Sequence, residues 1–396
     1  KFVLADTNIK IEDFNNFRDD NHCYLLEITL INIELKNKKT TLPYLQESKV
    51  NCGKIICHNK IVDNGRILKF DGITKIVCTD LDIDIIRQFY TFDTGIINRV
   101  YSSICGYLPK WLEETIDNFM IGKTHFKDLA KLYPENEDYS ISLMKSKNGL
   151  NSCYGMSATN PVRESWKLTD AGEWYIDNEN VSRETLYDKF YKSRNSFMRY
   201  EWGVWCTAWA RYELMEYYNA ITDNDKHSEL FIYCDTDSEF YISNEDVEIR
   251  IQLLNENKHK FAIEHGAYIT TESGRQQFYD IFELENEVIT DFRFLHSKCY
   301  GYITNDNKMY VTIAGVPKKQ NGVTRVQELG TLDNLTDGFI FKKCGGTRTI
   351  YKESAPAIIN IKGHLTEISS QAIILNTTKE LKSCERYDEN LIKYVY

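Results

Sequence analysis

The sequence predicts an α+β fold, because β-rich runs and long helical patterns follow one another along its 396 residues. Two observations carry this prediction. Apolar, β-branched runs at residues 23–28 and 31–35 predict strands, and the amphipathic spacing over residues 108–126 predicts a long helix. A hydrophobic fraction of 42% and an aromatic fraction of 13% are typical of a chain with a buried core. The length allows two or three subdomains.

The remaining elements follow in chain order. A polar stretch over residues 46–64 separates the first two strands from strands near 67–70 and 76–78. The acidic run that begins at Asp80 favours a short helix through Phe89, with its aspartates near the helix N-terminus. Further helices are expected over residues 108–126, 139–156, 201–220 and 247–265. Residues 160–200 are polar and weakly patterned, and residues 321–396 show mixed strands and turns.

Two aspartates one residue apart form the most informative motif, Tyr233-Cys234-Asp235-Thr236-Asp237-Ser238. Apolar runs flank the motif, a pattern that predicts a strand, a tight turn and a second strand. Side chains two apart on an extended backbone project to the same side, so both carboxylates can reach one divalent cation or share two. Oxygen ligands suit Mg²⁺ or Mn²⁺, and paired ions bind the attacking and leaving oxygens of a phosphoryl transfer. The alternative is an Asp-rich turn that is only solvated.

A second motif lies on the helix predicted over residues 139–156. Lys147, Asn151 and Tyr154 are spaced at i, i+4 and i+7 and therefore share one helix face. A cation, an amide and an aromatic ring on one face suit the triphosphate, sugar and base of a nucleotide. The alternative is a mixed polar helix surface with Leu150 directed to a core.

Two shorter motifs complete the pattern. Thr207 and Arg211 are one turn apart on the helix predicted over residues 201–220, where Trp202, Trp205 and Trp209 form a different stripe that we expect to pack in the core. Lys298 and Tyr300 follow in a β-like stretch, and their period-2 spacing places them on one face. Each of these short motifs occurs by chance in many proteins.

In this order, the motifs resemble those of the protein-primed family B DNA polymerases of bacteriophages and linear plasmids. The run Lys147-Asn148-Gly149-Leu150-Asn151-Ser152-Cys153-Tyr154-Gly155 matches motif B of that family at every specified position, and the Asp-Thr-Asp turn matches motif C. The resemblance covers roughly residues 23–350. It implies a right-hand polymerase body with an antiparallel palm sheet, helical fingers and a small thumb.

The resemblance also implies a division of the chain and a role for each motif. Residues 1–106 would be palm with a first insertion at about 46–90, 107–159 fingers, 160–200 a second insertion, 201–320 palm and 321–396 thumb. Asp235 and Asp237 would be the catalytic metal ligands, and Lys147, Asn151 and Tyr154 would bind the nucleotide. DNA would contact Ser152, Gly155, Thr207, Arg211, Thr236, Lys298 and Tyr300. The implied cofactor is Mg²⁺ or Mn²⁺, two ions in the complete enzyme.

Two features of the family are not found in the sequence. An upstream Asp-x-x-Ser-Leu-Tyr-Pro motif supplies a further metal ligand in that family, and an exonuclease domain precedes it; neither is present here. We therefore expect a fragment, or one piece of a split enzyme, that does not extend a primer alone. The expected partners are primer–template DNA, deoxynucleoside triphosphates, a terminal protein and the missing N-terminal segment. The expected location is the cytoplasm of an infected bacterium.

Composition limits the alternatives. The net charge of −10 is unexpected for a DNA-binding protein, although a local basic channel can lie on an acidic protein. No apolar run approaches the roughly 18 residues of a membrane span. Eleven scattered cysteines without framework spacing favour reduced thiols, and Cys153, Cys206, Cys234 and Cys299 are expected to face the core. A noncatalytic nucleic-acid-binding or terminal-protein-binding module, and a metal-dependent glycosyltransferase with a coincidental Asp-Thr-Asp, remain the rival functions.

Overall fold

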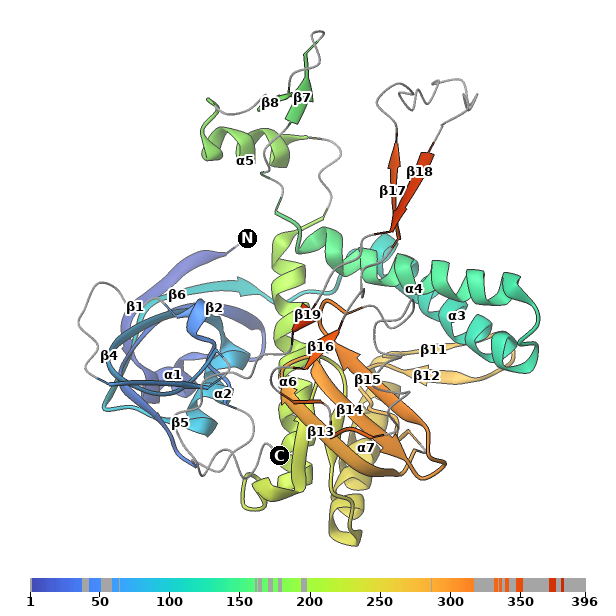
Figure 1. Cartoon of the computed structure of the whole chain (residues 1–396). Helices are drawn as coiled ribbons and strands as arrows, with labels where there is room; N and C mark the ends of the chain where they lie inside the picture. The colour runs from blue at the N-terminus through green and yellow to red at the C-terminus, as the bar shows by residue number, and fades with distance from the viewer. Residues whose placement is uncertain are drawn as a thin grey trace.

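The structure is a computed structural model, and it describes most of the chain up to residue 316 and short segments beyond. The described residues are 2–37, 43–50, 59–63, 65–160, 162, 166–169, 174–176, 180–193, 198–285, 287–316, 331–333, 335–336, 339–341, 347–351, 370–374 and 379–380. Most of the predicted thumb lies outside them. Figure 1 shows the arrangement of the elements.

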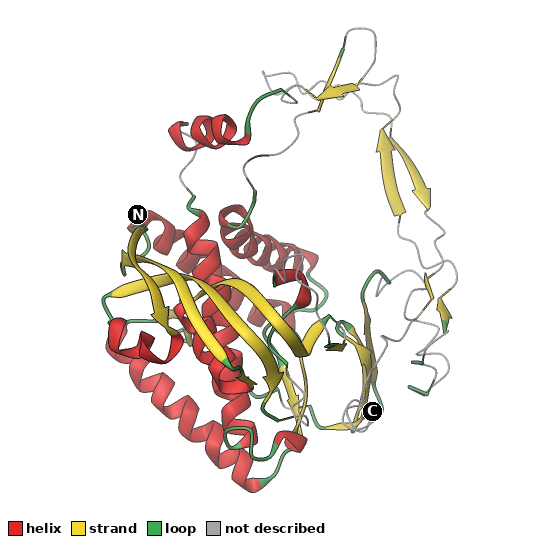
Figure 2. Ribbon diagram, turned by 90° about the vertical axis from the view of Figure 1, so that its left-hand side faces the viewer, coloured by secondary structure: helices red, strands yellow, loops and turns green. Residues whose placement is uncertain are grey.

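An antiparallel sheet occupies the N-terminal part of the chain, with strand order β1-β6-β2-β4-β3 and β5 beside β2. Figure 2 shows this sheet curving alongside the helices. Its strands are β1 (Val3–Lys10), β2 (His22–Leu35), β3 (Lys60–Asp63), β4 (Arg66–Thr79), β5 (Tyr90–Thr91) and β6 (Thr94–Ile104), with the one-turn helix α1 (Phe14–Phe17) between β1 and β2. Because β4 pairs with β2 from Thr79 to Lys69, the segment predicted as an insertion contributes a central strand to this sheet.

Strand β2 is continuous where the sequence predicts two strands. The register against β4 shifts between Ile31 and Ile33, and Asn32 between them has φ 54°. This bulge changes which residues face the core: Leu30 is buried before it and Ile33 after it. The apparent break in the sequence pattern therefore marks the point in one continuous strand at which the alternation of buried and exposed side chains shifts by one residue.

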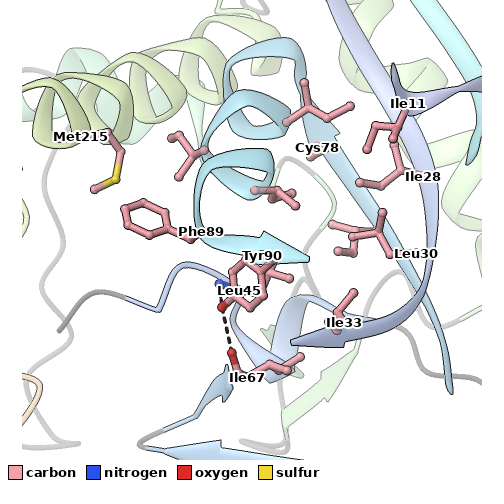
Figure 3. Close-up of a cluster of buried hydrophobic side chains, with 14 of the residues drawn as sticks. Ile11, Ile28, Leu30, Ile33, Leu45, Ile67, Cys78, Phe89, Tyr90 and Met215 are labelled. Carbon is pink, nitrogen blue, oxygen red and sulfur yellow. Dashed lines mark hydrogen bonds between the residues drawn. The ribbon is translucent and has the colours of Figure 1, made fainter. Parts of the chain in front are cut away.

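Helix α2 (Asp80–Phe89) has the bounds expected from the sequence and covers one face of the sheet. The Thr79 hydroxyl accepts a hydrogen bond from the Asp82 amide, and the Asp82 carboxylate accepts one from the Thr79 amide, which is a capping box. Figure 3 shows the core between sheet and helix, where the Tyr90 hydroxyl donates to the Ile67 carbonyl at 2.8 Å. The buried hydroxyl is thereby satisfied within an otherwise apolar cluster.

Four longer helices confirm the remaining helix predictions, each extended at one or both ends. They are α3 (Lys110–Leu132), α4 (Glu137–Ser157), α6 (Tyr200–Thr222) and α7 (Glu245–His265). Helix α6 runs through the centre of the molecule in Figure 1 and contacts α2, α4, α7 and the short strands β9 and β10. Among the described residues, none of the helices is both long and apolar enough to span a bilayer.

The remaining elements are small sheets, which include the hairpin predicted around Asp235 and Asp237, and one helix, α5, that the sequence did not predict. The two-stranded sheets are β7 (Trp166–Leu168) with β8 (Trp174–Ile176), β9 (Phe231–Cys234) with β10 (Glu239–Tyr241), β11 (Tyr268–Thr270) with β12 (Gln276–Phe278), β16 (Ile340–Phe341) with β19 (Lys379–Glu380), and β17 (Thr347–Tyr351) with β18 (Ser370–Ile374). A three-stranded sheet contains β13 (Ile289–His296), β14 (Cys299–Thr304) and β15 (Met309–Ile313). Helix α5 (Arg183–Lys192) begins at an Ser182 cap within the weakly patterned segment.

A partly buried ion pair joins α6 to α2, the helix that covers the first sheet. Arg211 of α6 donates from Nη2 and Nε to Asp82 Oδ1 at 2.7 and 3.0 Å, and the Tyr44 hydroxyl also donates to this carboxylate. The side chain of Asp82 is 7% exposed and that of Arg211 39%. Burial raises the pKa of Asp82, but the charge of Arg211 and the hydrogen bonds from Tyr44 and the Thr79 amide outweigh burial and lower this pKa overall.

The Asp82–Arg211 pair predicts an acid-dependent loss of stability. A carboxyl with a lowered folded-state pKa stabilises the fold above its unfolded pKa of about 3.9, and this contribution is lost as the pH falls through the folded-state pKa. Asp82→Asn should lower the free energy of unfolding at pH 7 by about 2–4 kcal/mol, below the upper end for a fully buried pair because Arg211 keeps some solvent. Denaturant titrations of wild type and mutant at neutral and acidic pH measure this.

Asp84→Asn on the same helix is the matched control. Asp84 pairs with Arg18 at 2.7 Å, but both side chains are 31% exposed. Its loss should cost about 0–1 kcal/mol. Two results would contradict the stabilising role of the Asp82–Arg211 pair. One is equal destabilisation by Asp82→Asn and Asp84→Asn. The other is a difference in the free energy of unfolding between wild type and Asp82→Asn that stays the same in acid.

Candidate nucleotidyl-transfer site

The Asp-Thr-Asp motif forms the turn between β9 and β10, as the sequence predicts. The Asp235 amide donates to the Ser238 carbonyl at 3.0 Å, and the Asp237 amide donates to the Asp235 carbonyl at 2.7 Å. Thr236 has φ 63°, so the backbone at the tip of the turn is left-handed. From the sequence we expected an extended backbone between the two aspartates, and this expectation was wrong. Asp237 is exposed, and the Asp235 side chain is 18% exposed. Both carboxylates therefore lie at the end of the hairpin.

One face of the hairpin packs on β13 and β14 through aromatic rings. The Tyr233 ring lies 5.0 Å from Tyr300 and 5.4 Å from Phe294 between centroids, and Phe240 lies 4.8 Å from Phe292. Rings at these separations and tilted angles attract one another beyond simple burial. This contact places the Lys298–Tyr300 segment directly beside the carboxylates.

Lys298 approaches the hairpin with both its backbone and its side chain. Its amide donates to the Tyr233 hydroxyl at 2.9 Å, and its Nζ lies 3.5 Å from Asp235 Oδ1. Lys298 has φ 57° and precedes β14 in the turn after β13. The structure thus brings the two motifs together, although they are separated by about sixty residues.

Helices α3 and α4 pack closely and bring lysines toward the same turn. A Cβ on Gly149 would lie 2.3 Å from the Phe119 ring, and one on Gly122 would lie 2.7 Å from Ser146 Oγ, so glycine allows the close approach. Burial lowers the pKa of Lys123, the charges of Lys127 and Lys147 lower it further, and Asp237 opposes them. Lys123 is therefore close enough to Lys147 and to Asp237 for the charge of each to act on it.

The predicted nucleotide-binding residues lie on α4 as expected. Lys147, Asn151 and Tyr154 are all exposed, and Tyr154 is 42% exposed. Ser152 is also exposed and donates to the Asn148 carbonyl within the helix, whereas Gly155 is half-buried. The helix face that carries these three residues is therefore exposed to solvent and is not packed in the core.

The residues predicted to contact template lie on α6. The Thr207 hydroxyl donates to the Val204 carbonyl at 2.9 Å, and the Arg211 guanidinium is bound by Asp82 and Tyr44. Their contact with DNA stays a prediction. Trp209 is 50% exposed, so its assignment to the core was wrong; Trp202 and Trp205 are only half-buried, and Trp205 stacks on Phe2 with ring centroids 5.2 Å apart.

The cysteines beside the motifs differ in exposure. Cys299 is buried, as predicted, and burial raises the pKa of Cys234 to about 12. Cys153 is half-buried, and Cys206 is exposed on α6, so the expectation of a core position was wrong for Cys206. The α6 surface around Cys206 and Trp209 was misjudged because a helix of mixed composition does not reveal which face its neighbours cover.

Comparisons with known proteins identify the fold. The chain is similar to phi29 DNA polymerase bound to primer–template DNA and incoming nucleotides, with a TM-score of 0.55 and 15% identity over 96% of this chain. It is also similar to phi29 DNA polymerase bound to single-stranded DNA, with a TM-score of 0.53 and 16% identity. The fold is similar to that of a DNA polymerase.

The chain spans about half the length of these structures, 54% of the first and 53% of the second. A third, phi29 DNA polymerase with primer–template DNA alone, gives a TM-score of 0.51 over 94% of this chain. No protein-family model and no curated protein sequence matches the chain. The similarity to the DNA polymerase fold therefore comes from structure and not from overall sequence.

Two residues of the site were missed in the sequence. Lys123 lies on a helix without a recognised motif, and only the packing of α3 on α4 places it near Lys147. Glu239 begins β10 directly after the turn, and both of its carboxylate oxygens are buried with no hydrogen-bond partner among the described residues. Burial raises the pKa of Glu239 well above its ordinary value. No group of three or more His, Cys, Asp or Glu side chains arranged to hold a metal occurs in the described part of the chain.

Glu239 predicts a stabilising substitution. A buried polar group without a partner costs about 1–3 kcal/mol, and methionine has a similar length without the polar oxygens. Glu239→Met should therefore raise the midpoint of thermal unfolding. Glu264→Met on the exposed surface of α7 is the control and should shift stability by less than about 0.5 kcal/mol. A lower midpoint for Glu239→Met would show that the carboxyl has a stabilising partner.

Proposed function

We propose that the chain is the polymerase part of a DNA-directed DNA polymerase. It would join a deoxynucleoside triphosphate to a DNA primer or to a terminal-protein hydroxyl, with release of pyrophosphate. The observation that carries the proposal is the contact of the Lys298–Tyr300 segment with the Asp235–Asp237 turn, 3.5 Å from Lys298 Nζ to Asp235 Oδ1, within a fold similar to that of a DNA polymerase. The phi29 structures contain primer–template DNA, incoming nucleotides or single-stranded DNA, and we extend these ligands to this chain by analogy.

The donor set at the turn fits Mg²⁺ or Mn²⁺. Asp235 and Asp237 offer only carboxylate oxygens, the ligands that these hard cations prefer, and Asp237 is accessible from solvent. Bound ions would stabilise the negative charge that develops on the transferring phosphoryl group. Lys298, at 3.5 Å from Asp235, balances part of the negative charge at the turn.

The lysines of α3 and α4 would bind the triphosphate. Burial is the main cause of the lowered pKa of Lys123, and repulsion from Lys127 and Lys147 lowers it further; a polyanion bound between Lys123 and Lys147 would relieve part of that repulsion. Asn151 and Tyr154, one and two turns beyond Lys147, would then place the sugar and pack on the base. Transfer needs no covalent enzyme intermediate, since holding the reacting oxygens in line and balancing charge accounts for most of the rate.

DNA would lie along the remaining motif residues. Lys298 and Tyr300 would hold the primer terminus beside the carboxylates, and Thr207 and Arg211 on α6 would contact the template. Ser152, Gly155 and Thr236 would line the same path. Because the net charge is −10, only local clusters of Lys and Arg would attract the DNA phosphates. Binding that depends on such contacts should weaken steeply as the salt concentration rises. We also propose that a terminal protein is a partner of this chain and that the protein acts in the cytoplasm of an infected bacterium.

The assignment of the metal ligands is tested by Mn²⁺ titration. The wild-type chain should bind Mn²⁺ weakly, and Asp235→Ala with Asp237→Ala should abolish this binding, because the turn loses both of its anionic ligands. The exposed acidic pair Glu245 and Asp246 at the start of α7, replaced by alanine together, is the control for charge alone. Equal Mn²⁺ affinity in the wild type and the Asp235–Asp237 double mutant would remove these residues from the site.

The nucleotide face is tested by lysine substitutions. Lys147→Ala and Lys123→Ala should each weaken binding of Mg²⁺–dATP by roughly tenfold or more, since a hydrogen bond to a charged group contributes about 1.5–3 kcal/mol. Lys131→Ala, in the last turn of α3, should leave the affinity unchanged. In an active enzyme Lys147→Ala should also lower kcat, whereas Leu150→Ala should act through stability. Unchanged nucleotide binding in both lysine variants would make α3 and α4 purely structural.

A gel-shift assay on primer–template, run beside a primer-extension assay, separates the rival functions. Binding with extension that Asp237→Ala abolishes supports the polymerase. Binding without extension, even when the upstream polymerase segment is added in trans, favours a noncatalytic module. Binding of a nucleotide sugar without any binding of DNA favours the glycosyltransferase.

A further inference from the structure

Residues 268–282 form a structural connection between the centre of the molecule and α3, and we call this segment the brace. It contains the hairpin of β11 and β12 and the turn that follows. At its C-terminal end, the Phe282 ring stacks on Tyr217 of α6 with centroids 4.3 Å apart, and the Phe282 amide donates to the Tyr217 hydroxyl at 2.9 Å. The Phe278 ring lies 3.9 Å from His259 of α7. The brace is thus fixed to the α6–α7 pair.

The other side of the brace holds α3 at two points. The Tyr279 hydroxyl donates to Asp117 Oδ1 at 2.6 Å, and Arg275 Nη1 donates to Asp128 Oδ1 at 2.7 Å. Burial and the hydrogen bond to Asp117 raise the pKa of Tyr279, so its hydroxyl remains protonated as a donor. Asp117 and Asp128 are about three turns apart and share one helix face. Figure 1 shows β11 and β12 directly beside α3, in agreement with their contacts.

The polar contacts matter because α3 has little core of its own. Among its 23 residues only Leu112 and Thr124 are buried. The close packing of α3 on α4 joins the two helices to each other, but α4 buries only Ser157, so this packing adds little buried core that would fix the pair against the rest of the molecule. Lys123 lies on this helix next to Thr124. Its position relative to Asp237 therefore depends on what restrains α3.

We propose that Tyr279 and Arg275 are positioning residues that hold α3 so that Lys123 faces the carboxylate turn and the triphosphate. This inference rests on the proposed function. Neither side chain would touch the nucleotide; each would raise the fraction of molecules in which α3 is correctly placed. Loss of a restraint lowers that fraction, and the apparent dissociation constant rises in inverse proportion to it.

The first test measures binding of Mg²⁺–dATP to the full chain by calorimetry. Tyr279→Phe removes one hydroxyl and should raise Kd about two- to tenfold, the range that one ordinary hydrogen bond allows. Asp117→Ala should do the same, and Asp117→Asn, which keeps the acceptor oxygen, should restore most of the affinity. The double variant Tyr279→Phe with Asp117→Ala should bind no more weakly than either single variant, because both remove the same contact.

The matched control is Tyr24→Phe in the N-terminal sheet. The Tyr24 hydroxyl also donates to an aspartate, Asp19, at 3.4 Å, and it lies far from α3 in the chain order and in the fold. Its removal should leave Kd for nucleotide unchanged. A purely structural Tyr279 would lower the thermal midpoint and leave Kd unchanged, and that result would overturn the proposal.

The second test does not depend on nucleotide binding. Hydrogen–deuterium exchange of the ligand-free chain should show faster exchange in α3 for Tyr279→Phe and Arg275→Ala, and no change in β2. Unchanged exchange in α3 would overturn the role of the brace. If wild type does not bind nucleotide while α3 still exchanges faster in the variants, the proposed function fails and the restraint of α3 by the brace stands without its link to the triphosphate. Faster exchange together with unchanged Kd would overturn the link to Lys123.

Discussion

The ion pair between Asp82 and Arg211 is the contact on which the arrangement of the site depends. Asp82 caps α2 on the first sheet and is almost fully buried, so its charge requires a partner, and Arg211 supplies it from the middle of α6. Helix α6 in turn contacts α4, α7 and both strands of the carboxylate hairpin. Together with the buried apolar side chains of α6, this pair holds in place the helix around which the proposed nucleotide and metal residues are grouped. The same contact gives Arg211 a structural role beside its proposed contact with the template.

The electrostatics of the site follow from this grouping. Cations from distant parts of the chain act at the turn: Lys298 Nζ lies 3.5 Å from Asp235 Oδ1, and the charge of Asp237 raises the pKa of Lys123 against the larger lowering effect of burial. Neither lysine is held by an aspartate in a closed, fully buried pair, so both remain available to an anionic substrate. A chain with a net charge of −10 can in this way present a local positive surface where a triphosphate would bind.

Much of this arrangement could be predicted from the sequence, and the limits have physical causes. Helix α2 and the carboxylate turn were predicted because capping residues and turn residues act locally. The edge strand β1 was not predicted, because it is almost wholly exposed and lacks an alternating pattern of apolar and polar residues. Its partner β6 was not predicted either. The bulge at Asn32 made one strand resemble two. Lys123 and the brace could not be predicted from local pattern at all, because their importance arises only when α3 packs on α4 and β11.

The central claim is that the carboxylate turn and the lysines of α3 and α4 form one site. The most direct measurement is a crystal structure of the chain with Mn²⁺ and a non-hydrolysable deoxynucleoside triphosphate, in which anomalous scattering locates the metal. We expect Mn²⁺ on Asp235 and Asp237 and the triphosphate between that metal and the side chains of Lys123 and Lys147. Mn²⁺ bound elsewhere, or a triphosphate that contacts neither lysine, would contradict it.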